Sequence, residues 1–441
     1  MMRFFILDFI KMNILIVGNG FDLSHYLPTK YDHFMVAMEA IENWDVSKGD
    51  MNFDDLFGSL YAREGYFLGY TKAMYKTDEI KISVEQIKEL QEQLRENVWY
   101  QYFKHHLSNI DTWIDFEEQI ESVLATVAKF CQETTQIYKL NERIDTQVFP
   151  INMNSMSNSN FICGEHTLQK LRSLGLIIER EDNFVGSKTN EINKEIFRNK
   201  NIKLDIDNLY IFRMLELGLR KFIDCFNFYL LNIVKILVLK KQLNNEIIGM
   251  DSIEEITVYS FNYTDTFQSF YSENSIVKYL HGKSGEKNNI VLGISELKEN
   301  YLKSLKIYGF TKYHQKLFKQ TDYLFLHEDE SLKNKIYPPS MGRHDLINIY
   351  IWGHSLANSD ENYVKEIFSY NDDSYCLVRI IIFYFNEDNF NLLNNLLDIL
   401  GKEKIELWMK KGWLKFEKNP DIAKINGIEP VDLPKEIAIA S

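Results

Sequence analysis

The sequence predicts an α/β protein in which a mostly parallel sheet is interrupted by a large helical insertion. Three observations support this fold class. Short, continuous apolar runs occur near residue 15 and again beyond residue 250, as expected for strands buried on both faces of a parallel sheet. These runs end in glycine or polar residues. The long region between them has apolar residues at the three- and four-residue intervals of amphipathic helices.

The chain is long enough for more than one domain. It has 441 residues, of which 45% are apolar and 14% are aromatic, so it can bury a large core. We predict an α/β core from residues 12–50 and 250–400, a mainly helical insertion at 51–249 and a C-terminal extension at 401–441. Within the insertion, residues 160–205 could form a small subunit.

Charge and cysteine content exclude several classes of protein. The net charge is −13 and the pI is near 5.4, which argues against nucleic acid as a partner, because phosphate binding needs clustered Lys and Arg. The cysteines form no Cys-x-x-Cys pair, which fits reduced thiols in the cytoplasm, and no metal is predicted. They are Cys131, Cys163, Cys225 and Cys376.

No segment predicts export or membrane insertion. The apolar residues 4–7 are followed at once by Asp8 and Lys11, and no cleavage site of small residues comes after them. Residues 226–239 are apolar but shorter than a bilayer-spanning helix, which fits a buried helix. We therefore expect a cytoplasmic protein that does not contact a membrane.

The first predicted strand, residues 13–17, leads into the turn Gly18-Asn19-Gly20. Two glycines after a buried strand let the backbone turn tightly, so that its N–H groups can face a pyrophosphate, as in Rossmann-like folds. The third glycine of the dinucleotide fingerprint is replaced by Leu23. Asp22 would repel a pyrophosphate unless it turned to a ribose hydroxyl or capped the following helix.

Polar or glycine residues also follow three strands predicted downstream. Residues 256–261 end in Asn262 and Tyr263, residues 276–280 end in His281 and Gly282, and residues 347–352 end in Gly353, His354 and Ser355. Ligands of open parallel sheets bind outside the carboxyl ends of the strands, so the four strand ends are expected to form one site. A further apolar run, residues 378–385, predicts a central buried strand.

The insertion is predicted to contain amphipathic helices over residues 84–107 and 115–138. Asp115 and Glu118 have the spacing of a capping box at the start of the second helix. Glu117 is not needed for that box and could reach a ribose. Further along, a short helix at 168–174 and a hairpin pairing 175–178 with 184–186 could form a winged-helix-like module or an irregular segment that recognises a partner.

Several of these motifs occur in an order that resembles the bacteriophage abortive infection AbiH family. The motifs are Gly18-Asn19-Gly20-Phe21-Asp22-Leu23, Leu27-Pro28-Thr29-Lys30-Tyr31, Trp113-Ile114-Asp115-Phe116-Glu117, Phe261-Asn262-Tyr263-Thr264, His281-Gly282 and Gly353-His354-Ser355-Leu356 followed by Asp360. Lys312 and Gln315 also belong to this resemblance, without an assigned chemical role. More distantly, Gly18, Gly20, Pro28, Asn262, His281 and Gly282 resemble the sirtuin-like (DHS-like) NAD-binding fold.

The resemblance implies an intracellular anti-phage effector that binds NAD or a related adenine nucleotide and could cleave the nicotinamide N-glycosidic bond. It makes His281 the catalytic general base and Asn262 the residue that orients water, amide or ribose. The residues expected to bind the nucleotide are Gly18, Asn19, Gly20, Asp22, Thr29, Glu117, Tyr263, Gly282, Gly353, Ser355 and Asp360.

Two departures from these families matter. Tyr26 replaces a glycine that both families usually carry before Leu27 and Pro28, which puts a positive φ in question there. No zinc ribbon is present, which favours water over a protein substrate as the acceptor.

The same motifs are also compatible with purely structural roles or with a different function. His281 could simply end a strand, and Asn262 could close an Asx turn. The protein could also be a catalytically silent nucleotide sensor whose insertion contacts a partner, a phage trigger or further copies of the chain. A toxin directed at nucleic acid is the least supported class, because the chain is acidic.

Overall fold

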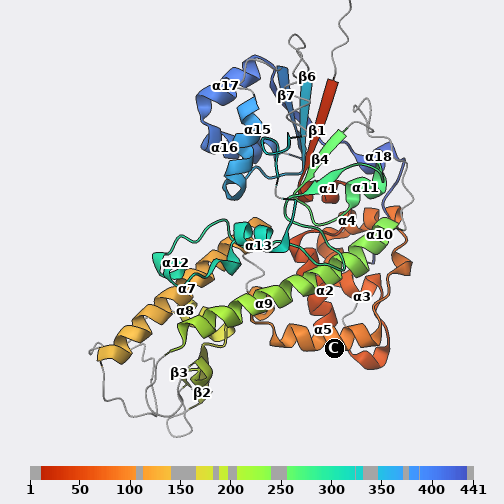
Figure 1. Cartoon of the computed structure of the whole chain (residues 1–441). Coiled ribbons are helices and arrows are strands. Elements are labelled where there is room, and N and C mark those ends of the chain that lie inside the picture. Colours follow the sequence, from red (N-terminus) through yellow and green to blue (C-terminus); the bar gives the residue numbers. More distant parts are fainter. Residues whose placement is uncertain are drawn as a thin grey trace, which may run out of the picture.

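The computed structural model describes residues 11–105, 113–140, 165–181, 188–196, 206–239, 256–322, 324–330, 346–370, 377–386 and 388–434. The upper part of the molecule in Figure 1 is built on a six-stranded parallel sheet. The strands are β1 (Lys11–Val17), β4 (Ile256–Ser260), β5 (Val277–Tyr279), β6 (Leu346–Trp352), β7 (Leu377–Tyr384) and β8 (Leu414–Lys418). Within the described part of the chain, no helix is long and apolar enough to cross a membrane.

The strand order confirms the Rossmann-like fold class. The order across the sheet is β5-β4-β1-β6-β7-β8. Counted along the chain, this is the order 3-2-1-4-5-6 of doubly wound α/β proteins. The order reverses between β1 and β6, and in such sheets the crevice at that switch point is where ligands bind.

Successive residues of β1 face opposite sides of the sheet, because side chains alternate along a strand. Ile14 and Ile16 join a core packed against α15 (Glu361–Ser369), α16 (Asn389–Leu400) and α17 (Lys402–Lys410). Leu15 and Val17 join a second core that continues into the helical insertion. One face of the sheet therefore shares its apolar core with the insertion, and the other face has a core of its own.

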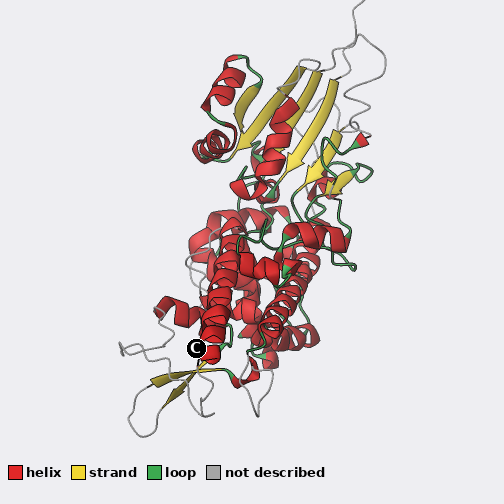
Figure 2. Ribbon diagram, turned by 60° about the vertical axis from the view of Figure 1, so that its left-hand side comes forward, coloured by secondary structure: helices red, strands yellow, loops and turns green. Residues whose placement is uncertain are grey.

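The insertion lies at the carboxyl edge of the sheet, toward which the strands point (Figure 2). It contains the long helix α9 (Asn208–Tyr229), which continues through a π-helical turn into α10 (Lys235–Leu239). The other described helices of this region are α3 (Phe53–Phe57), α4 (Tyr61–Met74), α5 (Val84–Glu96), α6 (Val98–His105), α7 (Trp113–Leu140) and α8 (Glu165–Ser173). Helix α2 (Tyr31–Glu42), from residues 12–50, packs against α3 and α5.

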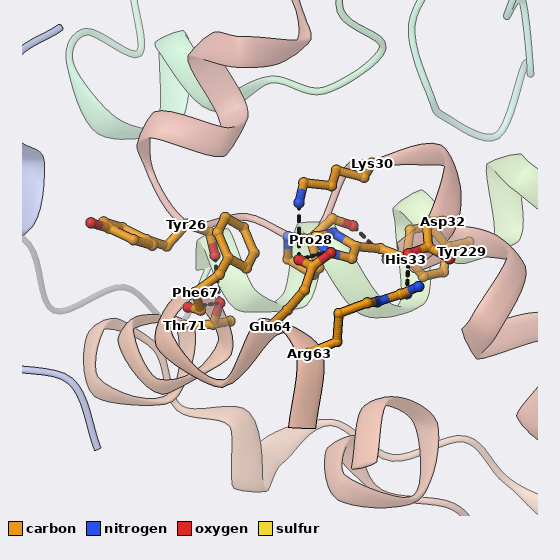
Figure 3. A network of polar contacts seen from close by, with 10 residues as sticks. All are labelled: Tyr26, Pro28, Lys30, Asp32, His33, Arg63, Glu64, Phe67, Thr71 and Tyr229. Atoms are coloured by element: carbon orange, nitrogen blue, oxygen red, sulfur yellow. Dashed lines mark hydrogen bonds and ion pairs between the residues drawn. The ribbon is translucent and has the colours of Figure 1, made fainter. Parts of the chain in front are cut away.

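Polar contacts tie the segment between β1 and α2 to the insertion (Figure 3). The hydroxyl of Tyr229 in α9 donates to the carbonyl of Pro28. Glu64 in α4 accepts from Lys30 at 3.0 Å and lies 2.8 Å from the imidazole of His33. Burial opposes ionisation, but these two partners lower the pKa of Glu64 to about 2. The segment is thus fixed by a carboxylate that stays charged.

Tyr26 has a φ of 55°, the left-handed conformation that glycine would adopt without strain. Its ring packs against Phe67 and Tyr70, and its carbonyl accepts from the hydroxyl of Thr71 at 2.8 Å. The backbone shape expected of a glycine is therefore kept, and tertiary packing holds the tyrosine in it.

The predicted elements shift at several places. The helix expected over 84–107 is divided at Asn97, whose side chain caps α6 by accepting from Trp99 and Tyr100. Helix α7 begins at Trp113, so Asp115 lies inside its first turn instead of capping it. In the hairpin, β2 (Ile177–Glu181) pairs with β3 (Lys188–Ile192), later than expected, and residues 184–186 lie outside the described part of the chain.

Candidate functional site

The ends of β1, β4, β5 and β6 are neighbours at one edge of the sheet, as the sequence predicts. Val17 is aligned with Ser260 of β4 and with Trp352 of β6, and Ser260 is aligned with Tyr279 of β5. All four strands are parallel, so the residues that follow them emerge on the same side. Segments more than two hundred residues apart in the chain thus converge.

The Gly18-Asn19-Gly20 turn packs directly on the end of β6. The N–H of Gly18 donates to Trp352 at 3.1 Å, and the N–H of Gly20 donates to the carbonyl of Gly353 at 2.9 Å. A Cβ on Gly20 would lie 2.7 Å from Cα of Gly353. The glycines are required for this close backbone contact. Two N–H groups expected to face a pyrophosphate are already used within the protein.

Asp22 lies in α1 (Asn19–Ser24) and is buried, whereas the N-cap position of this helix is Gly18. Its carboxylate accepts from the hydroxyl of Thr264 at 2.6 Å. Burial raises the pKa of Asp22 to about 6, although the hydrogen bond from Thr264 opposes the shift. Asp22 therefore joins the end of β1 to the end of β4 and does not cap its helix.

A charged cluster lies next to these strand ends. Nζ of Lys312, in α13 (Lys312–Lys319), lies 2.7 Å from Oε1 of Glu117 in α7 and 3.8 Å from Oδ1 of Asp360, which precedes α15. Burial raises the pKa of Glu117 to about 7, and this outweighs the opposing charge of Lys312. The pKa of Lys312 is raised despite its burial, because both carboxylates stabilise the ammonium.

Two histidines face the same carboxylate, Asp360. Nε2 of His281 lies 3.9 Å from Oδ1, and Nε2 of His354 lies 3.5 Å from Oδ2. Nδ1 of His354 accepts from the N–H of Leu356 at 2.9 Å, so its neutral form carries the proton on Nε2, directed at Asp360. Burial, followed by the nearby cations, lowers the pKa of His281 well below its usual value. Burial also lowers the pKa of His354.

Lys316 follows Lys312 by one helical turn. Its ammonium contacts the hydroxyl of Tyr363 and lies 4.7 Å from the centre of that ring. Burial and the charge of Lys312 lower the pKa of Lys316 to about 8. Tyr363, His281 and His354 all pack edge-on against Phe261 at the end of β4, which keeps the cluster compact.

Several polar atoms in and around this cluster lack a hydrogen-bond partner among the described residues. Such atoms are costly to bury, and each one requires an explanation. His281 Nε2 and Asp360 Oδ1 belong to the cluster itself, and Thr29 Oγ1 is a third such atom among the residues predicted from the sequence. Asn262 Nδ2 and Asp22 Oδ1 also lack a partner at hydrogen-bond length, but the Asn262 side chain lies near enough to Asp22 to lower the pKa of that carboxyl. The distances of 3.8 and 3.9 Å to Asp360 exceed hydrogen-bond length. The orphaned set contains both donors and acceptors.

The remaining predicted residues occupy different places. The carbonyl of Thr29 accepts from the indole of Trp113, at the start of the helix that carries Glu117. Burial, followed by the charges of Glu117 and Asp360, raises the pKa of Tyr263, and its hydroxyl donates to the carbonyl of Val291 at 3.0 Å. Gly282 forms a turn with a φ of 79°.

Two predicted residues, Asn19 and Ser355, are less buried than the cluster. Asn19 is half-buried at the start of α1. Ser355 is exposed, and its carbonyl accepts from Asn395 in α16. This hydrogen bond ties Ser355 to α16 and not to the charged cluster.

The burial of α13 against the cluster was not predicted from the sequence. Lys312, Gln315 and Lys316 share one helical face, and this face is buried. Gln315 holds the helix in place by pairing with both backbone groups of Leu292. The spacing of these residues was visible in the sequence, but lysines on a helix face normally predict contact with solvent.

The cluster is nearly closed. The side chains of Glu117, Lys312, Asp360, His281 and His354 are between 5% and 12% exposed. Exclusion of water strengthens electrostatic interactions and shifts pKa values, as in many active sites. A carboxyl group that titrates near pH 7 can exchange protons at neutral pH, whereas the histidines stay neutral there.

The strand order and the buried ionisable cluster at the switch point define a doubly wound α/β protein with a site at the carboxyl edge of its sheet. Residues 14–384 match the bacteriophage abortive infection AbiH family, and the chain belongs to that family. It is therefore a protein of phage abortive infection. Neither a curated protein nor a solved structure matches the chain.

Proposed function

We propose that the cluster around Glu117, Asp360 and His281 binds NAD or a related adenine nucleotide and cleaves its nicotinamide N-glycosidic bond. The observation that carries this proposal is the pair of orphaned atoms His281 Nε2 and Asp360 Oδ1, 3.9 Å apart, in one cluster with Glu117, a carboxyl group that titrates near neutrality. Depletion of a central metabolite would arrest the infected host, which suits a protein of abortive infection.

The unpaired atoms suit the ribose and amide groups of such a ligand. Asn262 Nδ2 can donate, Asp360 Oδ1 can accept, and His281 Nε2 can do either according to its tautomer. Hydroxyl groups of a ribose both donate and accept, so they can satisfy this mixture. The Gly18-Asn19-Gly20 turn is less suitable for a pyrophosphate, because two of its N–H groups are bonded to the β6 end.

In the proposed reaction, water attacks C1′ of the nicotinamide ribose and the bond from C1′ to the pyridinium nitrogen breaks. The electron pair of that bond neutralises the pyridinium, so nicotinamide leaves without needing a proton. The attacking water loses one proton, and we assign this proton to Glu117, whose pKa of about 7 suits a general base better than the lowered pKa of His281. His281 and Asn262 would position the ribose and the water.

Replacing Glu117 tests this assignment. Glu117→Gln should reduce nicotinamide release from NAD roughly 10²- to 10⁴-fold, which is the range for loss of a general base. Glu118→Gln is the matched control, because Glu118 is exposed on the same helix and loses the same charge. Nicotinamide should be measured by chromatography, and nucleotide binding by calorimetry, for both variants and the wild type.

The result separates catalysis from sensing. Equal release by Glu117→Gln and wild type would remove Glu117 from the mechanism, and absence of both binding and release in the wild type would contradict the proposal. Binding without release would favour the alternative, a catalytically silent nucleotide sensor. The near closure of the cluster is the observation that favours this alternative, because such a site must open before substrate enters.

A further inference from the structure

Helix α13 buries its lysine-bearing face and exposes its apolar face. Lys312 and Lys316 are 7% and 8% exposed, whereas Tyr313, Leu317 and Phe318 on the opposite face are 63%, 50% and 70% exposed. A surface helix normally buries its apolar stripe and leaves lysines in water. A helix that buries cations instead needs a polar reason for that orientation.

Glu117 explains the burial of Lys312 but not that of Lys316. Lys312 has a carboxylate partner at 2.7 Å. Lys316 forms no ion pair with any carboxylate of the described residues, and its contacts are the hydroxyl and the ring of Tyr363. A phenol is neutral at physiological pH, and burial raises the pKa of Tyr363 further. The buried charge of Lys316 is thus left without a counterion, which is costly.

The groups around Lys316 indicate which chemical class of counterion is missing. Glu117 and Asp360 act on Lys316 from beyond ion-pair distance and raise its pKa, while burial and Lys312 lower it. His281 and His354 have lowered pKa values and are neutral at physiological pH. Lysine ammonium groups bind phosphate oxygens through charge-assisted hydrogen bonds. An anionic ligand would supply the charge that the protein does not provide.

We propose that Lys316 binds the phosphate-bearing part of the ligand, so that α13, and not the Gly18-Asn19-Gly20 turn, recognises the pyrophosphate. This inference rests on the proposed function, because it assigns one part of the same nucleotide. The bonded N–H groups of Gly18 and Gly20 support it independently, since they remove the usual phosphate cradle of the fold. Lys316 is a binding residue here and has no part in bond cleavage.

The test measures affinity for ADP-ribose, which carries two charged phosphates and lacks the bond to be cleaved. Lys316→Gln should weaken ADP-ribose binding roughly 10- to 100-fold, the effect of one charge-assisted hydrogen bond, and should leave adenosine binding unchanged. Lys319→Gln is the matched control: it removes the same charge from the same helix, but its ammonium contacts the carbonyl of Ile290 outside the cluster. Its affinity should stay within about twofold of wild type.

Lys316→Arg and pH give further readings that do not depend on the folding of Lys316→Gln. Lys316→Arg keeps the charge and should retain most of the affinity. In the wild type, affinity for ADP-ribose should fall as pH rises through about 8, where Lys316 loses its proton. Burial also lowers the pKa of Lys319 to about 8, so the fall should persist in Lys319→Gln and be absent from Lys316→Gln. A dissociation constant that stays flat to pH 9.5, an unchanged affinity in Lys316→Gln, or equal losses in Lys316→Gln and Lys319→Gln would overturn the inference.

The two proposals can fail separately. ADP-ribose binding that depends on Lys316, without nicotinamide release from NAD, would retain the phosphate site and reject the hydrolase. Nicotinamide release combined with full ADP-ribose affinity in Lys316→Gln would retain the hydrolase and reject the phosphate site. Wild-type protein that binds no ADP-ribose would overturn the inference.

Discussion

Within the cluster, Glu117 changes protonation near pH 7 and Lys316 near pH 8. Burial is the first cause in both, and it has opposite effects on an acid and on a base because it disfavours the charged form of each. The two groups lie on α7 and α13, which come from different parts of the chain. Their shifted pKa values therefore arise from tertiary packing and not from either helix alone.

These shifts predict a bell-shaped pH profile for kcat/KM of nicotinamide release. Below about pH 7, Glu117 is protonated and cannot accept a proton from water, so the rate should rise as pH increases through 7. Above about pH 8, Lys316 loses the charge that binds phosphate, so the rate should fall. Initial rates between pH 5.5 and 9.5, on the order of ten values, would define both limbs.

The variants assign each limb of the profile. The acidic limb should disappear in Glu117→Gln, and the basic limb should disappear in Lys316→Gln. Persistence of the acidic limb in Glu117→Gln would show that another group, such as Asp22 with its pKa of about 6, is responsible.

Stability should also respond to the pKa of Lys316. In the folded state this pKa lies below the usual value, so the unfolded chain binds more protons between about pH 8 and 10.5. Lys316 therefore costs stability below pH 8, and the cost is relieved as pH rises through that window. Anion binding would relieve the same cost at neutral pH.

The neighbourhood of strand ends could be predicted where a motif marked each end. Asn262 and His281 follow strands whose apolar runs are clear, and these strands are paired in the sheet. Lys316 could not be predicted as a buried residue, because the apolar residues Tyr313, Leu317 and Phe318 would normally mark the inner face of α13. The tertiary environment sets the orientation of the helix, because two carboxylates lie beside Lys312 and Tyr363 contacts Lys316.

At the scale of elements, the strands were predictable where an apolar run ends in glycine or polar residues, which includes the edge strand β5. Strands β1, β4, β5, β6 and β7 agree with their predicted ranges to within one or two residues. Edge strand β8 was not identified, because its exposed residues include Lys415 and Glu417 and its apolar run is short. The segment counted as a C-terminal extension therefore contributes a strand to the sheet.

The Gly18-Asn19-Gly20 turn packs so closely on the end of β6 that one added methyl group should lower the free energy of unfolding. Gly20→Ala should lower the free energy of unfolding by about 1 to 3 kcal/mol, because its Cβ would meet the backbone of Gly353. Gly65→Ala, in α4, should raise it by roughly 0.5 to 1 kcal/mol, because nothing lies within 4 Å of that Cβ and alanine favours helix. Urea denaturation of both variants would measure the difference.

An equal, small effect of the two substitutions would contradict the close packing of the turn. Loss of nucleotide binding in Gly20→Ala without loss of stability would instead indicate that the turn contacts ligand directly. That result would restore the phosphate role predicted for Gly18 and Gly20 from the sequence.

At the scale of the whole molecule, the site is shared between the sheet and the helical insertion. Glu117 comes from the insertion, Asn262 and His281 follow strands of the sheet, and Lys312 belongs to the segment between β5 and β6. The insertion lies at the carboxyl edge, where ligands of this fold class bind (Figure 2). A relative movement of insertion and sheet would therefore open or close the cluster as a unit.

The most direct measurement is a crystal structure of the Glu117→Gln variant with NAD, in which slow turnover should preserve the substrate. We expect the nicotinamide ribose within hydrogen-bond distance of Asn262 and His281, and the pyrophosphate against Lys316. A nucleotide bound elsewhere on the protein, or no bound nucleotide at saturating concentration, would contradict the assignment of this cluster as the nucleotide site.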